Sequence, residues 1–178
     1  MDPEPDFGTL SDLIRGHARR DPDHAALLQD GRALSYGGLD TLMDRVAAAL
    51  QRDDIAPQGS ISICAGTSIE YAAVFLGALR AGVAVAPLAP SCTAEELTGM
   101  AADAGAKLWF LDATVGTTLD PVAARIAAQR ISLDASSAGQ PLSAWLAPAG
   151  AQPAPVEIRP EWAFNIIYSS GTSGSPKG

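Results

Sequence analysis

Short apolar segments alternate with helical patterns along most of this sequence. Residues 61–65 and 83–86 are nearly continuous runs of apolar and small residues, without strict alternation of polar and apolar side chains. Such strands are typically buried on both faces, and helices between successive strands supply the crossovers that parallel pairing requires. The sequence therefore predicts an α/β fold, with a mostly parallel sheet flanked by helices.

Capping and turn residues set the expected boundaries of these elements. Asp30-Gly31 favours a type I′ turn between two strands, and Thr93-x-x-Glu96 is a capping box. Residues 135–160 are rich in Ala, Ser, Gly and Pro and predict a surface connection with a helical turn at 142–146. The expected strands are 25–29, 32–35, 61–65, 83–86, 107–111, 130–133 and 163–167, and the expected helices follow Thr9 or Ser11, Ser35, Ser68, Thr93 and Pro121, the last at 122–129.

The last eleven residues, 168–178, read YSSGTSGSPKG and directly follow the apolar segment 163–167. Hydroxyl groups, successive backbone N–H groups and one ammonium group are what a loop needs to hold a polyphosphate. Glycines let the backbone come close to the ligand and adopt positive φ. The predicted phosphate-binding residues are Ser169, Ser170, Gly171, Thr172, Ser173, Gly174 and Lys177.

Two comparisons separate this loop from other glycine-rich segments. The P-loop motif G-x-x-x-x-G-K-[ST], counted from Gly171, would need glycine where Pro176 stands and a hydroxyl where Gly178 stands. Ser/Gly-rich runs are commonly flexible linkers, but a linker seldom follows an apolar strand directly. We interpret the segment as a ligand-binding loop.

The loop resembles the phosphate-binding signature of the adenylate-forming (AMP-binding) superfamily, Tyr-Thr-Ser-Gly-Thr-Thr-Gly-x-Pro-Lys-Gly. Nine of the eleven positions agree, counting the free one, and Ser169 and Ser173 keep the hydroxyl where the signature has threonine. This superfamily includes acyl-CoA synthetases, luciferases and peptide-synthetase adenylation domains. A weaker resemblance extends to residues 33–39, where Gly38 replaces a common glutamate, and to residues 68–87.

The resemblance implies that a carboxylic acid is activated with ATP as an acyl-adenylate and then joined to the thiol of coenzyme A. An acid-thiol ligase of this kind would act on a fatty or aromatic acid. Mg²⁺ would accompany the ATP, and no protein metal site is predicted. Lys177 is expected to be an auxiliary catalytic residue on the departing pyrophosphate, because the principal catalytic lysine of the family lies in a later, C-terminal domain.

By the same resemblance, residues 1–178 would be the N-terminal portion of an AMP-binding domain that ends in the loop at 168–178. The rest of the large domain and the C-terminal domain would lie outside this chain. We therefore expect this chain alone to be inactive and to require the remaining part of its own chain. Gly178 is expected to be an artificial boundary, and the acid, the thiol acceptor and the oligomeric state, a homodimer included, stay open.

Composition excludes several other classes. A net charge of −8 argues against a general nucleic-acid binder. Cys64 and Cys92 indicate reduced thiols, as in a cytoplasmic protein. Glu70 and Arg80 interrupt the longest apolar run, so no membrane span is predicted, and the acidic N-terminus does not match a secretory signal.

Two alternative functions stay open. An adenylation domain of a peptide synthetase would be accompanied by an adjoining carrier domain. A noncatalytic α/β interaction module, with the glycine-rich tail as a tether, would lack the strand and helix that the enzyme needs after the loop.

Overall fold

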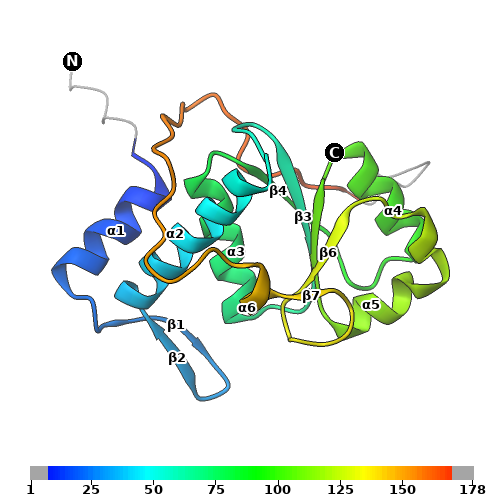
Figure 1. Ribbon diagram of the computed structural model, residues 1–178, viewed down its shortest axis with the longest axis horizontal. Coiled ribbons are helices and arrows are strands. Elements are labelled where there is room, and N and C mark those ends of the chain that lie inside the picture. Colours follow the sequence, from blue (N-terminus) through cyan, green and yellow to red (C-terminus); the bar gives the residue numbers. More distant parts are fainter. Residues whose placement is uncertain (1–7, 170–178) are drawn as a thin grey trace.

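The computed structural model describes residues 8–169, in which a parallel sheet separates two layers of helices (Figure 1). The five strands are all parallel and follow the order β4-β3-β5-β6-β7. The α/β architecture predicted from the sequence is confirmed. The strands are β3 Ser60–Cys64, β4 Ala84–Pro87, β5 Leu108–Leu111, β6 Gln129–Ser132 and β7 Gln140–Pro141.

Helices cover both faces of this sheet. Strand β5 illustrates why: Leu108 and Phe110 are buried in the core under α2 and α3, whereas Trp109 and Leu111 are buried in the core under α4 and α5. Successive side chains of a strand point to opposite faces, so a strand covered on both sides has to be apolar throughout. The helices are α2 Tyr36–Arg52, α3 Ile69–Arg80, α4 Ala94–Asp103 and α5 Ala113–Leu119, followed by the 3₁₀ helix η1 Asp120–Arg125.

Two smaller units complete the fold. The antiparallel hairpin of β1 Ala25–Gln29 and β2 Arg32–Ser35 turns at Asp30 and Gly31, whose φ angles of 48° and 78° suit a type I′ turn. Helix α1 Leu10–Arg20 packs on α2. The short helix α6 Leu142–Trp145 carries a buried tryptophan into the α2/α3 core. The boundaries of strands β1 to β6 and of α6 match the predicted ones within one residue.

Helix starts follow the predicted caps. The side chains of Thr9, Ser35 and Ser68 accept hydrogen bonds from the backbone N–H groups of the first turns of α1, α2 and α3. Thr93 and Glu96 bond reciprocally at the start of α4, so the capping box is present.

The helix expected at residues 122–129 is found only in part. Residues 122–125 belong to the 3₁₀ helix η1, with Pro121 in its first turn as predicted, but the helix ends at Arg125 and Gln129 begins β6. Helical structure also begins earlier, at α5, because Asp112 accepts a hydrogen bond of 3.0 Å from the N–H of Val115 and so caps that helix. Val115, Leu119 and Val122, four and then three residues apart, face the α4/α5 core, so the apolar spacing already starts before the proline.

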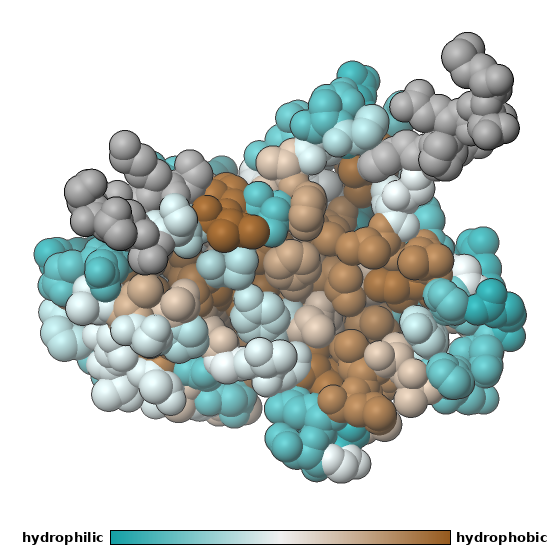
Figure 2. All heavy atoms as spheres, turned by 180° about the vertical axis from the view of Figure 1, so that it is seen from behind, coloured by the Kyte–Doolittle hydropathy of each residue, from teal (hydrophilic) through white to brown (hydrophobic). Residues whose placement is uncertain are grey.

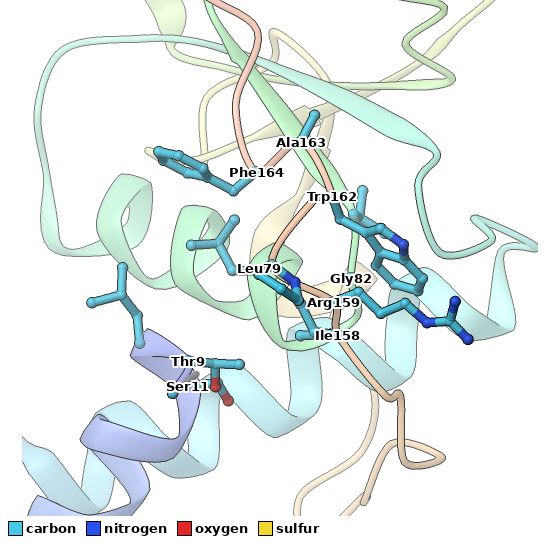
Figure 3. A pocket seen from close by; sticks show the side chains of 13 residues that line it. Thr9, Ser11, Leu79, Gly82, Ile158, Arg159, Trp162, Ala163 and Phe164 are labelled. Atoms are coloured by element: carbon cyan, nitrogen blue, oxygen red, sulfur yellow. The ribbon is translucent and has the colours of Figure 1, made fainter. Parts of the chain in front are cut away.

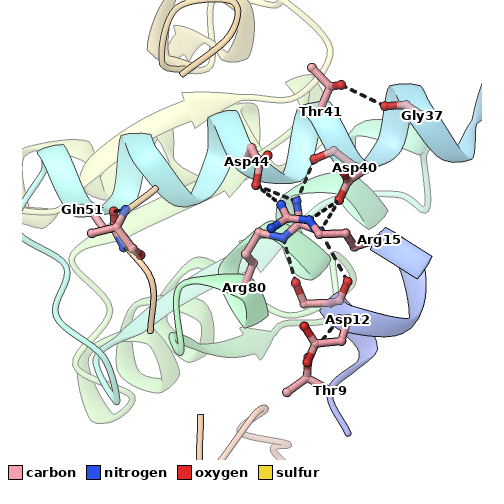
Figure 4. Close-up of polar contacts among 11 residues, drawn as sticks. Thr9, Asp12, Arg15, Gly37, Asp40, Thr41, Asp44, Gln51 and Arg80 are labelled. Atoms are coloured by element: carbon pink, nitrogen blue, oxygen red, sulfur yellow. Dashed lines mark hydrogen bonds and ion pairs between the residues drawn. The ribbon is translucent and has the colours of Figure 1, made fainter. Parts of the chain in front are cut away.

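Three helices are joined by a buried ion-pair cluster that the sequence did not reveal (Figure 4). Arg80, only 7% exposed, donates to Asp40 (2.6 Å), Asp44 (2.8 Å) and the hydroxyl of Ser11 (2.7 Å). Arg15 on α1 forms ion pairs with the same two carboxylates, Asp40 and Asp44. The cluster fixes α1, α2 and α3 relative to one another.

The connection after α6 runs over the surface, as predicted, and we call residues 147–162 the strap. Side chains of α2 hold its backbone: the Gln51 amide donates to the carbonyl of Ala154 (2.9 Å) and accepts from its N–H (2.8 Å). Arg45 donates to the carbonyl of Ala147 (2.7 Å). These side-chain contacts stand in place of a regular ladder of backbone hydrogen bonds, and they direct the chain back to the sheet.

Candidate functional site

Residues 163–169, which we call the stem, lead from the strap into the predicted phosphate loop. Within residues 163–167, a single parallel bridge between Asn165 and Val85 replaces the expected regular strand, and Ser169 at the end of the stem is in a further isolated bridge. The N–H of Ile166 donates to the carbonyl of Val85 (2.8 Å), and the N–H of Val85 donates to the carbonyl of Phe164 (3.1 Å). The expected strand is therefore reduced to a single point of pairing.

Pro87 explains why the pairing stops. The N–H of Val85 points toward the stem, so the next donor on that side of β4 would come two residues later, from Pro87, which has no N–H. Because the bridge is parallel, the stem still runs in the same direction as β4. The chain therefore leaves the stem toward the edge of the sheet where the strands have their carboxyl ends.

One predicted phosphate-binding residue lies within the described part of the chain. Ser169 ends the stem and is exposed. The others lie outside the described residues: Ser170, Gly171, Thr172, Ser173, Gly174 and Lys177. Their roles stay predictions.

Tyr168 precedes Ser169 and is attached to the body of the fold. Its ring packs against the α4/α5 core, and its hydroxyl donates a hydrogen bond of 2.7 Å to Oδ2 of Asp103, the last residue of α4. Partial burial, with the hydrogen bond and the negative charge of Asp103, raises the pKa of Tyr168 to about 12. Both the ring and the hydroxyl group of Tyr168, the residue before Ser169, are thus held by the body of the fold.

A second feature at the same sheet edge is a polar cavity of about 730 Å³, which we call the edge cavity. It lies beyond the carboxyl ends of β3, β5 and β6. Open α/β sheets commonly bind ligands at this edge, where the strand order reverses. Its polar side chains are Gln29, Arg32, Thr67, Ser68, Glu70, Asp112, Ser132, Asp134 and Ser143.

The carboxylates of the edge cavity already have hydrogen-bond or ion-pair partners within the fold. Asp112 accepts a hydrogen bond from the N–H of Gly66 (2.8 Å), and Glu70 pairs with Arg32. Burial alone would raise the pKa of Asp134, but hydrogen bonds from Ser136 and from the first N–H of α5 hold it below its usual range. Three carboxylates against one arginine make this cavity unfavourable for a triphosphate.

The comparisons with known proteins decide the family. The sequence profile described as AMP-binding enzyme matches residues 14–178. This chain belongs to the AMP-binding enzyme family. It is 29% identical over 175 residues to a fatty acid–[acyl-carrier-protein] ligase, ScoC, of Streptomyces coeruleorubidus, covering 98% of this chain and 33% of the relative.

A second sequence relative and two solved structures are also similar to this AMP-binding chain. Tyrocidine synthase 3 of Brevibacillus parabrevis is 30% identical over 174 residues, which are 96% of this chain and 2% of that synthase. The structure of VinN matches with a TM-score of 0.80 and 28% identity, over 95% of this chain and 42% of VinN. The N-terminal domain of FACL13 from Mycobacterium tuberculosis matches with a TM-score of 0.80 and 22% identity, over 92% of this chain and 42% of its own. The chain thus spans a third or less of the length of ScoC and of tyrocidine synthase 3.

The stem of this AMP-binding chain also borders an apolar pocket of about 250 Å³ (Figure 3). Leu79, Ile158, Trp162 and Phe164 line it, from the end of α3, the strap and the stem. Phe164 is 58% exposed, and apolar side chains gather across the middle of this face of the molecule (Figure 2). The stem is therefore bound to the sheet by a backbone bridge and lies in an otherwise apolar surface.

Metal-binding and membrane-spanning features were searched for in the same residues. Between residues 8 and 169, no group of three or more His, Cys, Asp or Glu side chains is placed to hold a metal ion. Over that range, every helix is too short or too polar to cross a bilayer. Cys64 and Cys92 are free, and burial raises the pKa of the Cys64 thiol to about 12.

Sequence reasoning missed the contacts that hold the stem and strap. Asp103 gives one signal: it is an acid in the last position of a helix whose final turn has no basic residue. A negative charge is disfavoured there by the helix dipole, which indicates a role outside the helix. Gln51 gives no such signal, because a polar residue near the end of a surface helix is ordinary.

Proposed function

We propose that this chain is the N-terminal part of an enzyme that activates a carboxylic acid with ATP and passes the acyl group to a thiol. In the first step, a carboxylate oxygen attacks the α-phosphorus of ATP, a P–O bond forms to give the acyl-adenylate, and pyrophosphate leaves. In the second step, the thiol sulfur attacks the acyl carbon, and AMP leaves as the thiol proton is released.

The part of this chain in the reaction is to hold the polyphosphate. The hydroxyl groups of Ser169, Ser170, Thr172 and Ser173 would donate to phosphate oxygens, and the glycines would let backbone N–H groups approach. Lys177 would stabilise the charge that builds up on pyrophosphate. This donor set fits a polyphosphate with Mg²⁺, because Mg²⁺ in such sites is bound largely by phosphate oxygens and water.

The bridge between Asn165 and Val85 supports this proposal most directly. It directs the stem parallel to β4, so Ser169 and the following loop start at the carboxyl edge, where α/β sheets bind nucleotides. A flexible tether would need no such pairing. The negatively charged edge cavity at the same edge competes poorly for ATP, which favours the loop as the polyphosphate site.

The acceptor thiol is proposed to be that of coenzyme A. A second candidate is the thiol of a carrier protein, and one relative favours it, because it is named a fatty acid–[acyl-carrier-protein] ligase. The activation half-reaction is the same for both acceptors. The edge of the sheet that binds ATP does not distinguish them.

The test is carboxylate-dependent exchange of labelled pyrophosphate into ATP by the complete protein that contains this chain. A panel of fatty, aromatic and amino acids would identify the substrate class, and exchange with at least one of them is expected. The second half-reaction is then followed with coenzyme A and with a phosphopantetheinylated carrier protein in separate arms. An absence of exchange with every acid, under conditions in which the protein is folded, would contradict the proposed function.

A further inference from the structure

The stem is anchored at two places that differ in kind. At its centre, backbone hydrogen bonds join Ile166 and Phe164 to Val85. Near its end, the side chain of Tyr168 connects it to the body, through its ring on the α4/α5 core and its hydroxyl on Asp103 at 2.7 Å. Ile167 between them is 67% exposed. The direction in which the chain enters the loop therefore depends on the second anchor.

Asp103 stands where the helix itself gains nothing from it. It is the last residue of α4, and the partial negative charge at the end of a helix repels a carboxylate. The final turn of α4 has no basic residue to offset this repulsion. The only hydrogen bond in the described residues that uses the Asp103 side chain is the one from Tyr168, whose own neighbour is the first predicted phosphate-binding residue.

We propose that Asp103 is a positioning residue for ATP, which acts through Tyr168 to fix the start of the phosphate loop. This inference rests on the proposed function of the loop. The hydroxyl of Tyr168 and the carboxylate of Asp103 hold the residue before Ser169 against α4, so that the chain enters the loop in a fixed direction. A direction that is fixed before ATP binds lowers the cost of binding.

The kinetic test uses four variants of the complete protein: Tyr168→Phe, Asp103→Ala, Asp103→Asn and the Tyr168→Phe/Asp103→Ala double variant. Losing the contact should raise KM for ATP roughly 3- to 10-fold, the range for one ordinary hydrogen bond, because Asp103 acts on ATP only through Tyr168, with kcat within about twofold. The double variant should lose no more than either single variant, because both remove one shared contact. Asp103→Asn keeps an acceptor oxygen and should recover most of the loss.

A spectroscopic titration of the complete protein checks the contact itself. The phenolate absorbance of Tyr168, assigned by difference from Tyr168→Phe, should titrate lower in Asp103→Ala than in the wild type, because both the acceptor and its charge are gone. Asp23→Asn, which removes an exposed carboxylate in the turn between α1 and β1, is the charge-matched control and should leave both readouts unchanged.

The outcomes separate this inference from the proposed function. Exchange activity with an unchanged KM for ATP in Asp103→Ala would overturn the role of Asp103 and leave the proposed function standing. An unaltered Tyr168 titration in Asp103→Ala would overturn the contact. An absence of exchange in the wild type would overturn both the proposed function and this inference.

Discussion

The body of the chain, residues 8–146, and the strap and stem, residues 147–169, are held together by different means. The body is built from regular elements around apolar cores on both faces of the sheet. The strap and stem form a backbone bridge to the sheet and are also bound by individual side chains such as Gln51 and Asp103. Large apolar side chains of the stem, Phe164 among them, remain exposed.

This difference separates stability from function. Burial of apolar side chains dominates the stability of a domain, and it is distributed over many residues. A segment held by a few hydrogen bonds can be displaced at a cost of a few kcal/mol while the rest stays folded. Variants in the body should therefore change unfolding, whereas variants in the strap, stem and loop should change ATP use or local order.

Removing the arginine at the centre of the ion-pair cluster should have the largest effect. Arg80→Ala leaves the buried Asp44 and the half-buried Asp40 without their main partner, and breaking a buried pair from one side costs about 3–5 kcal/mol. Urea unfolding followed by circular dichroism measures this loss. A cost below about 1 kcal/mol would mean that Arg15 or water can replace Arg80, and that α1 is not fixed by the cluster.

An exposed arginine provides the matched control. Arg125 pairs with Glu95 at 3.3 Å, and both side chains are more than 60% exposed. Surface pairs of this kind contribute roughly 0–1 kcal/mol, so Arg125→Ala should leave the unfolding midpoint almost unchanged.

The loop lysine should give the next largest effect, on catalysis and not on folding. Lys177→Ala in the complete protein is expected to lower kcat/KM for adenylation roughly 10- to 150-fold, because a charge-assisted hydrogen bond to phosphate contributes about 1.5–3 kcal/mol. Pyrophosphate release at limiting and at saturating ATP measures it, with the melting temperature as the control. Unchanged rates under both conditions would remove Lys177 from the site.

The strap should respond locally and weakly. Gln51→Ala removes both hydrogen bonds to Ala154, and for exposed groups we expect a loss of roughly 1 kcal/mol. Hydrogen exchange should increase in residues 147–162 but not in β3 or β5, as measured by mass spectrometry. Gln152→Ala, an exposed glutamine on the strap itself, is the control. Equal increases in the body would show that the strap is part of the cooperative unit.

The sequence predicted the body far better than the stem, for physical reasons. Caps such as Thr9 and Ser35 and the Asp30-Gly31 turn are local, so they could be recognised without the tertiary structure. Strand pairing of the stem depends on a partner distant in sequence, and Pro87, which limits that pairing, is visible only once β4 is known to be the neighbour. Local capping and turn residues can be recognised in a sequence, whereas long-range strand pairing cannot.

The candidate site divides in the same way. The glycine-, serine- and lysine-containing composition of the loop pointed to a polyphosphate because those groups are its ligands, whatever the fold. The contact of Asp103 joins two residues that are 65 positions apart, and the contacts of Arg80 with Asp44 and Asp40 span 36 and 40 positions. No local pattern predicts such contacts. Asp103 gives one signal, an acid at the end of a helix where the dipole disfavours it, whereas Arg80, a basic residue in the last turn of α3, gives none.

Acid should produce the smallest effect, at the junction of body and strap. Asp53, at the end of α2, accepts hydrogen bonds from Arg52 (2.8 Å) and from Nε1 of Trp145 (2.7 Å). Burial would raise the pKa of Asp53, but these hydrogen bonds outweigh it and lower the pKa below its usual value. A lowered pKa in the folded state means that the carboxylate stabilises the protein above the unfolded pKa of about 3.9, and that this contribution is lost as the pH falls below it. After solvent screening we expect less than about 1 kcal/mol.

Asp53→Asn tests this directly, because the amide oxygen can still accept from Trp145 but carries no charge. The difference in unfolding free energy between wild type and Asp53→Asn should be present at about pH 7 and should decrease as the pH falls below the unfolded pKa of about 3.9 and then through the lowered pKa of the folded state. Asp54→Asn is the matched control: Asp54 is exposed and has a φ of 56°, which asparagine tolerates, so the variant should follow the wild type at every pH. A difference that stays constant as the pH falls would mean that the shape of the side chain, and not its charge, joins the end of α2 to Trp145, and the junction would then be as insensitive to acid as the apolar core beneath it.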